Sequence, residues 1–404
     1  MKYVVILGDG MADYPVESLG GKTPLEVAKK PFTDALARVS ETGLVRTVAE
    51  GLKPGSDVAN LSVLGYDPKE CYTGRSPLEA ASIGISLKDT DVTARANLVT
   101  LSEEPFYEDK TMVDYSAGEI STEEAKILID YLAEKLNDEK YKLYAGVSYR
   151  HCLVAANGVI AGDLTPPHDI TGKLIKDYLP KSAAGAAYLS MMKRSYELLK
   201  NHPVNVARKK AGKNPANSLW FWGEGTKPAL ERFSERYGLK GTMISAVDLL
   251  KGIGKLSGMD VVEVAGATGN YDTNFAGKAE ACLNALANGS DFVYIHMEAP
   301  DECGHHGDAP HKIYSIEQID DKVVKRVVEG LNATGEEYSV MILPDHPTPI
   351  KTMTHCSDPV PFMIYRSGQK AAAFTAEKYD EESAKKTGLF VPSGVELMRR
   401  FLRK

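Results

Sequence analysis

Three aspartates, Asp9, Asp301 and Asp345, stand after short apolar runs that are rich in β-branched residues. Short runs of this kind that end in glycine or proline predict buried strands of a parallel sheet. Ligands bind beyond the carboxyl ends of such strands, so we expect the three carboxylates to converge at one edge. Histidines follow two of the aspartates, at His305 and His346. Carboxylates and imidazoles at one sheet edge indicate a metal site.

The segment from Ala299 to Asp308 carries the strongest single motif. Asp301 and His305 are four residues apart, so one helical turn or a tight loop brings both side chains to one point. A carboxylate with a neutral imidazole suits Mn²⁺, Zn²⁺ or Fe²⁺ better than Ca²⁺, which prefers oxygen ligands alone. In isolation this spacing more often belongs to polar side chains exposed to solvent, but its position after a buried strand favours a metal site.

Two further segments add ligand candidates. Asp345 and His346 lie between Pro344 and Pro347, whose rings stiffen the loop. The same residues could also form an ordinary turn with a capping aspartate. His355 precedes another apolar run, and only the company of the other groups favours it as a ligand.

Together these segments supply more ligands than one ion needs: Asp9, Asp301, His305, Asp345, His346 and His355. Two ions about 3.5–4 Å apart would use them all and leave room for an oxygen nucleophile. That arrangement serves phosphoryl transfer, because one ion lowers the pKa of the nucleophile and both neutralise charge on the transferred group.

Ser56 is the candidate nucleophile. It follows the turn residues Pro54 and Gly55 and precedes an apolar segment that begins at Val58. A serine just before a helix lies near backbone N–H groups that favour anions, and a metal can activate its hydroxyl without a histidine base. A plain helix N-cap is the alternative. A Ser-His-Asp hydrolase is disfavoured because the pattern Gly-x-Ser-x-Gly is absent.

The elements that must position these residues alternate between strand and helix at both ends of the chain. This succession predicts an α/β fold with a mostly parallel sheet flanked by helices. Further along, alternating apolar and polar residues replace the buried runs, and one amphipathic helix covers 122–137. Such alternation predicts a sheet with one wet or partly covered face. We therefore expect a core of residues 1–65 and 181–404 and a smaller inserted α+β domain of residues 66–180.

Length and composition exclude several classes of protein. A chain of 404 residues is long enough for two domains. Its net charge of −7 and pI of about 5.8 argue against nucleic-acid binding, and no stretch approaches the roughly 20 apolar residues that span a bilayer. An apolar strand, not a basic leader, opens the chain, and the five cysteines are far apart. We expect a reduced, cytoplasmic protein, and no feature indicates an oligomeric state.

The motifs, taken in order, resemble the alkaline phosphatase superfamily, and more closely the archaeal-type branch of the cofactor-independent phosphoglycerate mutases. The resemblance spans essentially the whole chain, and the ordered set is far more specific than any one part. It rests on Gly8-Asp9-Gly10, Gly55-Ser56-Asp57, Thr73-Gly74-Arg75-Ser76-Pro77, Ala94-Arg95-Ala96-Asn97, Asp301-x-x-x-His305, Asp345-His346 and His355. It implies an alkaline-phosphatase-like core, an inserted phosphotransferase-like domain and two divalent ions, usually Mn²⁺, with Mg²⁺, Zn²⁺ or Co²⁺ as alternatives.

The resemblance also implies a role for each matched residue. Ser56 would be the phosphorylated nucleophile in the glycolytic interconversion of 3-phosphoglycerate and 2-phosphoglycerate. One metal would be held with Ser56 by Asp9, Asp345 and His346, and the other by Asp301, His305 and His355.

A small substrate that carries phosphate and carboxylate needs cations with bidentate reach, which favours arginine. Arg75, Arg95 and Arg150 are the candidates, and His151 could donate or accept a proton beside them. Each of these residues, taken alone, is more often part of a surface ion pair. Asp163, His168 and Asp169 are expected to shape the same cleft, without an assigned role.

Glu298 departs from the family pattern, since archaeal mutases usually have lysine at this place. A charge reversal beside the metals would repel an anionic substrate, unless the metals screen it. Some bacterial proteins of this branch act as homoserine kinases, and Glu298 could instead meet the ammonium group of homoserine. The mutase is the preferred hypothesis. A homoserine kinase-like phosphotransferase of threonine biosynthesis and a metal-dependent phosphatase are the alternatives.

Overall fold

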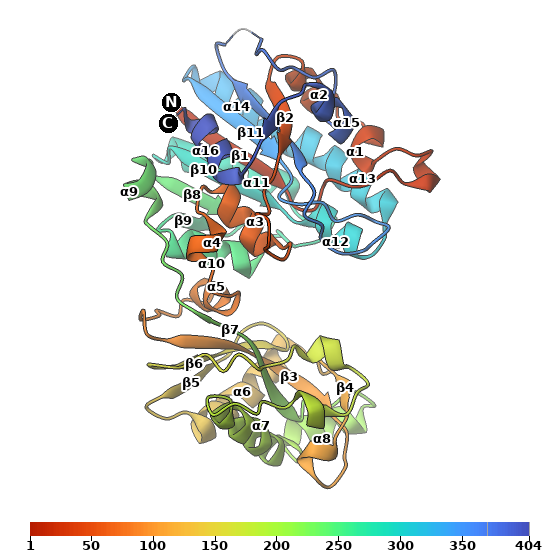
Figure 1. The fold of residues 1–404 in the computed structure, drawn as a ribbon, viewed down its shortest axis with the longest axis vertical. Helices are drawn as coiled ribbons and strands as arrows, with labels where there is room; N and C mark the ends of the chain where they lie inside the picture. The colour runs from red at the N-terminus through yellow and green to blue at the C-terminus, as the bar shows by residue number, and fades with distance from the viewer. Residues whose placement is uncertain (370, 404) are drawn as a thin grey trace. The chain divides into compact units, whose positions relative to one another are not determined.

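The computed structural model describes residues 1–369 and 371–403 and divides into two compact units. The core unit consists of Met1–Tyr72 and Ala229–Lys404, and the inserted unit is Thr73–Pro228. Figure 1 shows the ribbon leaving the core after α4 and returning to it after β7. The two-part organisation expected from the sequence is therefore present.

The boundaries of the insertion differ from the expected 66–180. The inserted unit begins later, at Thr73, and it also includes the segment 181–228, which the sequence interpretation gave to the core. The reason is strand pairing: β7 (Ser218–Thr226) runs antiparallel to β3 (Val92–Leu101). The helix α7 (Ala186–Leu199) packs in the same hydrophobic cluster as both strands. A helix followed by a strand looks alike in either unit, so periodicity alone placed this segment wrongly.

The core unit is built on an eight-stranded sheet in the order β13-β2-β12-β11-β1-β10-β8-β9. Strands β11, β1, β10, β8 and β9 are mutually parallel, and β12 is antiparallel to both of its neighbours. The strands are β1 (Lys2–Gly8), β2 (Glu41–Val45), β8 (Gly241–Ile244), β9 (Asp260–Val262), β10 (Phe292–Met297), β11 (Tyr338–Leu343), β12 (Val360–Arg366) and β13 (Phe390–Val391).

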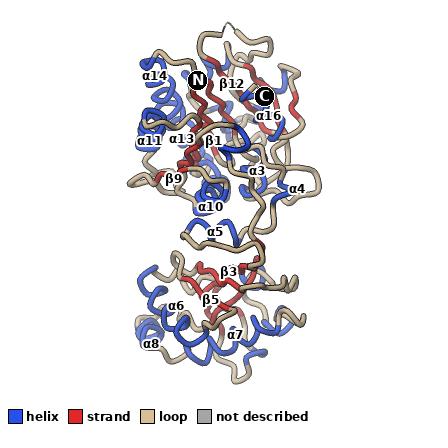
Figure 2. Tube along the Cα trace, turned by 90° about the vertical axis from the view of Figure 1, so that its left-hand side faces the viewer, coloured by secondary structure: helices blue, strands red, loops and turns tan. Residues whose placement is uncertain are grey.

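Helices cover both faces of this sheet, as Figure 2 shows from the side. Every residue of β10 and β11 is buried, as expected for strands enclosed on both faces. One face packs on α11, α13 and α14, and the other on α3, α10 and α16. The helices of this unit are α1 (Pro24–Val27), α2 (Pro31–Ala37), α3 (Ser56–Val63), α4 (Pro68–Cys71), α9 (Phe233–Tyr237), α10 (Asp248–Leu256), α11 (Phe275–Ala287), α12 (Ala299–His305), α13 (Ala309–Gln318), α14 (Lys325–Thr334), α15 (Glu381–Lys386) and α16 (Gly394–Leu402). The expected α/β fold class is confirmed.

The inserted unit has its own antiparallel sheet, in which β4, β3, β6 and β5 are neighbours in that order and β7 also pairs with β3. Helices α6 and α7 share one hydrophobic core with the sheet, and α5 packs on its other face. The remaining bounds are β4 (Met112–Asp114), β5 (Tyr141–Tyr144), β6 (Arg150–Ala155), α5 (Ser76–Ser82), α6 (Thr122–Leu136) and α8 (Pro203–Lys210). The α+β character expected of the insertion matches this arrangement.

The parallel register brings three strand ends together. Leu7 of β1 pairs with His296 of β10 on one side and with Leu343 of β11 on the other. The residues that follow these strands therefore emerge at one edge of the core sheet. In the part of the chain that the structure describes, no helix is long and apolar enough to cross a membrane.

Candidate active site

The predicted ligands come from four segments at this sheet edge. Asp9 follows β1 directly, and Asp345 and His346 are in the loop that leaves β11. Asp301 and His305 lie one turn apart on α12, so both side chains are on one face of this helix. The helix begins immediately beyond β10, which brings them to the sheet edge. The loop that leads into β12 adds His355 (residues 354–359 are without regular structure).

The first group of side chains surrounds the Nε2 atom of His346. This nitrogen is 3.5 Å from Asp9 Oδ1, 3.4 Å from Asp345 Oδ2 and 3.2 Å from Ser56 Oγ. Ser56 Oγ is also 3.4 Å from Asp9 Oδ2. Four side chains from distant parts of the chain thus present oxygen and nitrogen atoms to one point.

The second group adjoins the first. His305 Nε2 is 3.2 Å from Asp301 Oδ2, and His355 Nε2 is 3.5 Å from Asp301 Oδ1. The two Nε2 atoms of His305 and His355 face each other at 2.9 Å. The ring centroid of His355 is only 4.1 Å from that of His346, so the two groups form one continuous site.

The chemistry of this donor set fits two divalent cations. Burial, together with the nearby charges of Asp345 and Asp301, raises the pKa of Asp9 well above its ordinary value. The Oδ1 atom of Asp9 is buried without a hydrogen-bond partner, which is unusual for a carboxylate. Contact with Asp301 raises the pKa of His305 to about 9. Crowded carboxylates, an orphaned oxygen and facing imidazole nitrogens are the groups that a divalent ion would satisfy.

Hydrogen bonds from neighbouring elements orient Asp345. Its carboxylate accepts bonds from Gly10 N at 3.1 Å and from Asn60 Nδ2 at 2.8 Å. The Oδ1 atom of Asn60 in turn accepts a bond from the buried Tyr294 hydroxyl at 2.6 Å. Gly10 has φ +58, and a Cβ atom there would lie 2.5 Å from Asp301 Oδ1. Glycine is therefore required where β1 turns between the two ligand groups.

Ser56 is the first residue of α3, a helix of eight residues. Its hydroxyl contacts Asp9 and His346, and the N-cap position of α3 belongs to Gly55. The alternative interpretation as a plain N-cap is therefore not supported. The hydroxyl instead lies among the candidate ligands, at the positive end of a helix dipole.

The three candidate arginines all belong to the inserted unit. Glu79 Oε1 accepts from Arg75 Nε at 2.8 Å, and Glu79 Oε2 accepts from Arg95 Nε at 2.9 Å. The Arg95 guanidinium also stacks over Trp222, 4.0 Å from the ring centroid. Arg150 is exposed, and it pairs with Asn97 on the neighbouring strand. Asn97 is two residues from Arg95, so the side chains of Arg150 and Arg95 point to the same face of the sheet. Arg75, Arg95 and Arg150 thus gather on one face of the inserted sheet.

His151 lies on the other side of its strand from Arg150, because successive side chains of β6 point to opposite faces. It is buried, and its Nδ1 atom accepts a bond from Gly146 N at 3.1 Å. Burial lowers the pKa of His151 to about 3. An enclosed, neutral imidazole does not support the expected exchange of protons with a substrate.

The three residues without an assigned role have different surroundings. The Asp163 carboxylate accepts bonds from Lys181 N and Ser182 N at 2.7 Å each and therefore closes a loop. His168 packs edge-on against Trp222, with ring centroids 5.1 Å apart, and so adjoins Arg95. Asp169 is exposed.

Comparison with known proteins agrees with this geometry. A family model described as 2,3-bisphosphoglycerate-independent phosphoglycerate mutase matches residues 37–205. A relative of that name from Methanosarcina barkeri is 49% identical over 399 residues, with 98% of each chain covered. A probable mutase of the same description from Geobacter sulfurreducens is also 49% identical, with 100% of each chain covered. This chain belongs to the 2,3-bisphosphoglycerate-independent phosphoglycerate mutase family.

Solved structures support the same relationship. The PH0037 protein from Pyrococcus horikoshii matches with a TM-score of 0.82 and 31% identity, over 100% of this chain and 97% of that one. The cofactor-independent phosphoglycerate mutase from Thermoplasma acidophilum matches with a TM-score of 0.65 and 26% identity, over 100% and 99%. The resemblance expected from the motifs is confirmed.

Glu298, the residue that departs from the family pattern, points into the protein. It is only 2% exposed. Its carboxylate lies 2.7 Å from Lys278 Nζ and 3.0 Å from His296 Nδ1. Burial alone would raise the pKa of Glu298, but the charge of Lys278 and the contact with His296 lower it. The carboxylate is therefore ionised and paired internally, and neither repulsion of an anionic substrate nor recognition of an ammonium group is supported.

Several supporting residues of this mutase-family site were not predicted from the sequence. Asn60 and His296 contact candidate ligands directly, and Thr348 donates a hydrogen bond to Asp301. One signal was available, namely a polar residue in an otherwise buried apolar segment. Asn60 lies between Ala59 and Leu61, and His296 is within the fully buried β10.

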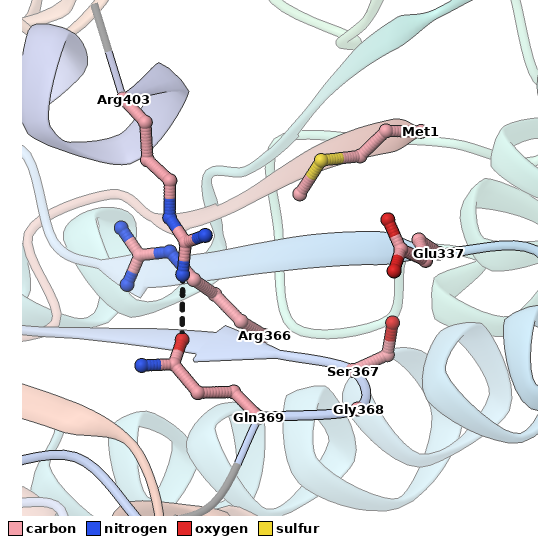
Figure 3. Close-up of a pocket in the computed structure, with 7 residues that line it drawn as sticks. All are labelled: Met1, Glu337, Arg366, Ser367, Gly368, Gln369 and Arg403. Carbon is pink, nitrogen blue, oxygen red and sulfur yellow. Dashed lines mark hydrogen bonds between the residues drawn. The ribbon is translucent and has the colours of Figure 1, made fainter.

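A separate cavity of about 390 Å³ lies at the opposite edge of the core sheet, near the start of β1 and β11 (Figure 3). It is lined by Met1, Glu337, Arg366, Ser367, Gly368, Gln369 and Arg403. Arg403 Nη2 donates to Gln369 Oε1 at 2.7 Å there. None of the predicted site residues lines this cavity, so it does not belong to the candidate active site.

Proposed function

We propose that this protein interconverts 3-phosphoglycerate and 2-phosphoglycerate through a phosphoserine at Ser56. The observation that carries the proposal is the position of Ser56 Oγ. It lies 3.2 Å from His346 Nε2 and 3.4 Å from Asp9 Oδ2, beside two converging ligand groups. Membership of the mutase family gives the substrate class, a small phosphorylated sugar acid.

The proposed metal ligands fall into the two groups of neighbouring side chains described above. Asp9, Asp345 and His346 would hold one ion together with Ser56, while Asp301, His305 and His355 would hold the other. His346 Nε2 also lies close to the second group. When bound, two such ions lower the pKa of a hydroxyl and neutralise charge on a transferred phosphoryl group. The family resemblance implies Mn²⁺ first among the candidates, and a site of mixed carboxylate and imidazole ligands can hold it.

The reaction balances without a second substrate. Ser56 Oγ bonds to phosphorus as the bond from phosphorus to the 3-oxygen of the substrate breaks, and that oxygen takes the proton that the serine loses. The glycerate then reorients, and its 2-oxygen bonds to phosphorus while the bond to Ser56 breaks. The proton of the 2-hydroxyl returns to Ser56. Water must be kept from the phosphoserine during this exchange.

The inserted unit supplies the guanidinium groups for an anionic substrate in this proposal. Arg75, Arg95 and Arg150 suit phosphate and carboxylate because a guanidinium binds either in bidentate fashion. Glu79 and Trp222 fix the direction of Arg95. His151 is enclosed, so we give it no proton-transfer step.

The homoserine kinase alternative loses the feature that favoured it. Glu298 was the only residue that suggested an ammonium-bearing substrate, and its charge is neutralised by Lys278. The five cysteines are all free, which is typical of a reducing compartment, and we propose that the enzyme acts in the cytoplasm.

Removal and return of metal tests the proposal. Dialysis against a chelator should abolish conversion of 3-phosphoglycerate, and Mn²⁺ should restore it. Mg²⁺, Zn²⁺ and Co²⁺, added separately to the same metal-free protein, rank the alternatives. An enzyme that keeps full activity in excess chelator would contradict the two-metal assignment.

A further inference from the structure

Four buried ionisable side chains contact one another in series, and the last of them, Asp9, is a proposed metal ligand. Lys278 Nζ, on α11, is 2.7 Å from Glu298 Oε2. Glu298 Oε1 is 3.0 Å from His296 Nδ1, and His296 Nε2 is 3.1 Å from Asp9 Oδ2. All four residues are buried.

The far end of this series, at Lys278 and Glu298, is fixed on several sides. Lys278 Nζ donates a second hydrogen bond, at 2.8 Å, to the backbone oxygen of His296. Glu298 Oε1 also accepts bonds from Ser245 Oγ at 2.8 Å and from Ala246 N at 3.0 Å. Glu298 therefore cannot turn away without breaking bonds to β10, α11 and the loop after β8. The imidazole ring of His296 is held in one direction as a result.

At the near end, the imidazole of His296 lies close to one carboxylate oxygen of Asp9, without the alignment of a hydrogen bond. Its Nε2 atom is beside Oδ2. The other oxygen, Oδ1, is buried without a hydrogen-bond partner and lies 3.5 Å from His346 Nε2. The contact with His296 thus leaves free the oxygen that faces the ligand group of His346.

We infer that Lys278, Glu298 and His296 are positioning residues, which direct the Asp9 carboxylate toward the ion that Asp345 and His346 would also hold. The inference rests on the proposed two-metal function. A contribution to stability does not explain this series of buried charges, because the cost of removing charges from water offsets most of their mutual attraction. Groups behind metal ligands, in contrast, orient those ligands, and their loss lowers metal affinity about ten- to a hundredfold.

Titration of the metal-free, full-length protein with Mn²⁺ in a calorimeter tests this inference. Glu298→Gln keeps the size of the side chain but loses the charge that orients His296. We expect its dissociation constant for Mn²⁺ at the site that includes Asp9 to rise about ten- to a hundredfold. Ser245→Ala removes the bond to Glu298, the 3.4 Å contact of the hydroxyl with His296 Nδ1 and a bond from Val247 N, and it leaves every charge in place. It should weaken Mn²⁺ binding severalfold, and it gives a result even if Glu298→Gln does not fold.

A reversed pair separates positioning from general stabilisation. The double variant Lys278→Glu/Glu298→Lys keeps two opposite charges but places an ammonium group, which cannot accept a hydrogen bond, beside His296 Nδ1. We expect its Mn²⁺ affinity to stay low. Arg208→Met is the control, because it removes another buried cation, the partner of Glu124 in the inserted unit. This control should lower stability to urea and leave Mn²⁺ affinity unchanged.

Wild-type Mn²⁺ affinity in Glu298→Gln, Ser245→Ala and the reversed pair would overturn the inference. Failure of the wild-type protein itself to bind Mn²⁺ would overturn the metal site and the inference together. If Mn²⁺ binding responds as expected while 3-phosphoglycerate is not converted, the proposed reaction is wrong and the positioning role stands.

Discussion

At the scale of single residues, the hydroxyl of Ser56 contacts candidate metal ligands and does not cap its helix. It heads α3 without capping it, and its contacts are with Asp9 and His346. A serine whose hydroxyl contacts candidate ligands contributes little through that hydroxyl to the stability of its own helix. Its removal should therefore affect chemistry much more than folding.

Ser56→Ala should reduce conversion of 3-phosphoglycerate by at least about a thousandfold, because the phosphoryl acceptor is lost. The urea midpoint should change little, and Mn²⁺ should still bind at Asp301, His305 and His355. Ser102→Ala, a serine in the inserted unit whose hydroxyl bonds locally to Glu104, serves as the control and should be fully active. Full activity in the Ser56 variant would remove this residue from the mechanism.

Glu381 gives a prediction about pH. Its carboxylate accepts bonds from Thr23 Oγ1 at 2.7 Å and Asp13 N at 3.0 Å, but burial raises the pKa of Glu381 to about 7. An acid with a raised pKa binds its proton more tightly in the folded state. Its contribution to stability is complete below the unfolded pKa of about 4.5 and is lost as the pH rises through 7.

The free energy of unfolding should therefore contain a term of about 3 kcal/mol that disappears between pH 4.5 and 7. Glu381→Gln, which cannot ionise, should lack this term. Urea unfolding at several pH values in both proteins measures the difference. Parallel stability curves for the two proteins would show that Glu381 titrates normally.

At the scale of elements, the site depends on loops that are tied to one helix. Lys312, on α13, lies 2.7 Å from Asp13 Oδ2 and donates to the backbone oxygen of Thr348 at 2.8 Å. Asp13 Oδ1 in turn accepts from Ile350 N at 3.2 Å. This buried pair connects the loop after β1 with the loop after β11, and both loops carry candidate metal ligands.

Lys312→Met should destabilise the protein by about 3–5 kcal/mol, because it leaves the Asp13 charge buried without its partner. The double variant Lys312→Met/Asp13→Asn should recover part of that loss, since no unpaired charge remains. Urea unfolding of the wild type, both single variants and the double variant gives the coupling energy. Strictly additive losses would mean that the two side chains do not act as a pair.

The strand ends could be predicted from sequence, whereas the direction of several side chains could not. Asp9, Asp301 and Asp345 follow buried parallel strands, and the geometry of such sheets dictates where they emerge. His151 and Glu298 are different cases. One residue separates an exposed position from a buried one in a strand such as β6, and Glu298 is buried because Lys278, on another element, pairs with it. Contacts of this kind depend on packing between elements and leave no local pattern.

At the scale of the whole molecule, the division into units decides where each function resides. All six candidate metal ligands lie in the core unit, and the three candidate arginines lie in the inserted unit. The end of the insertion was misplaced in the sequence analysis because β7 pairs with β3, a partner more than a hundred residues earlier in the chain. Sequence periodicity reports local structure and carries no record of such pairing.

Replacing Thr73–Pro228 with a short flexible linker should leave a core that unfolds cooperatively, because every strand of the eight-stranded sheet is retained. This core should bind Mn²⁺ but not convert 3-phosphoglycerate. A matched deletion of residues 66–180 removes β3 and leaves β7 without its pairing partner. This variant should therefore aggregate. Circular dichroism and urea unfolding distinguish the two, and a stable product from the second deletion alone would contradict the observed boundary.

The central claim is that phosphate moves within one substrate through Ser56 at a two-metal site. Phosphorus NMR of the Mn²⁺-loaded protein with 3-phosphoglycerate tests it directly, with homoserine and ATP in a parallel sample. We predict a 2-phosphoglycerate signal in the first sample, no release of inorganic phosphate, and no phosphohomoserine in the second. Phosphohomoserine in the second sample with no 2-phosphoglycerate in the first, or inorganic phosphate as the sole product, would contradict this account.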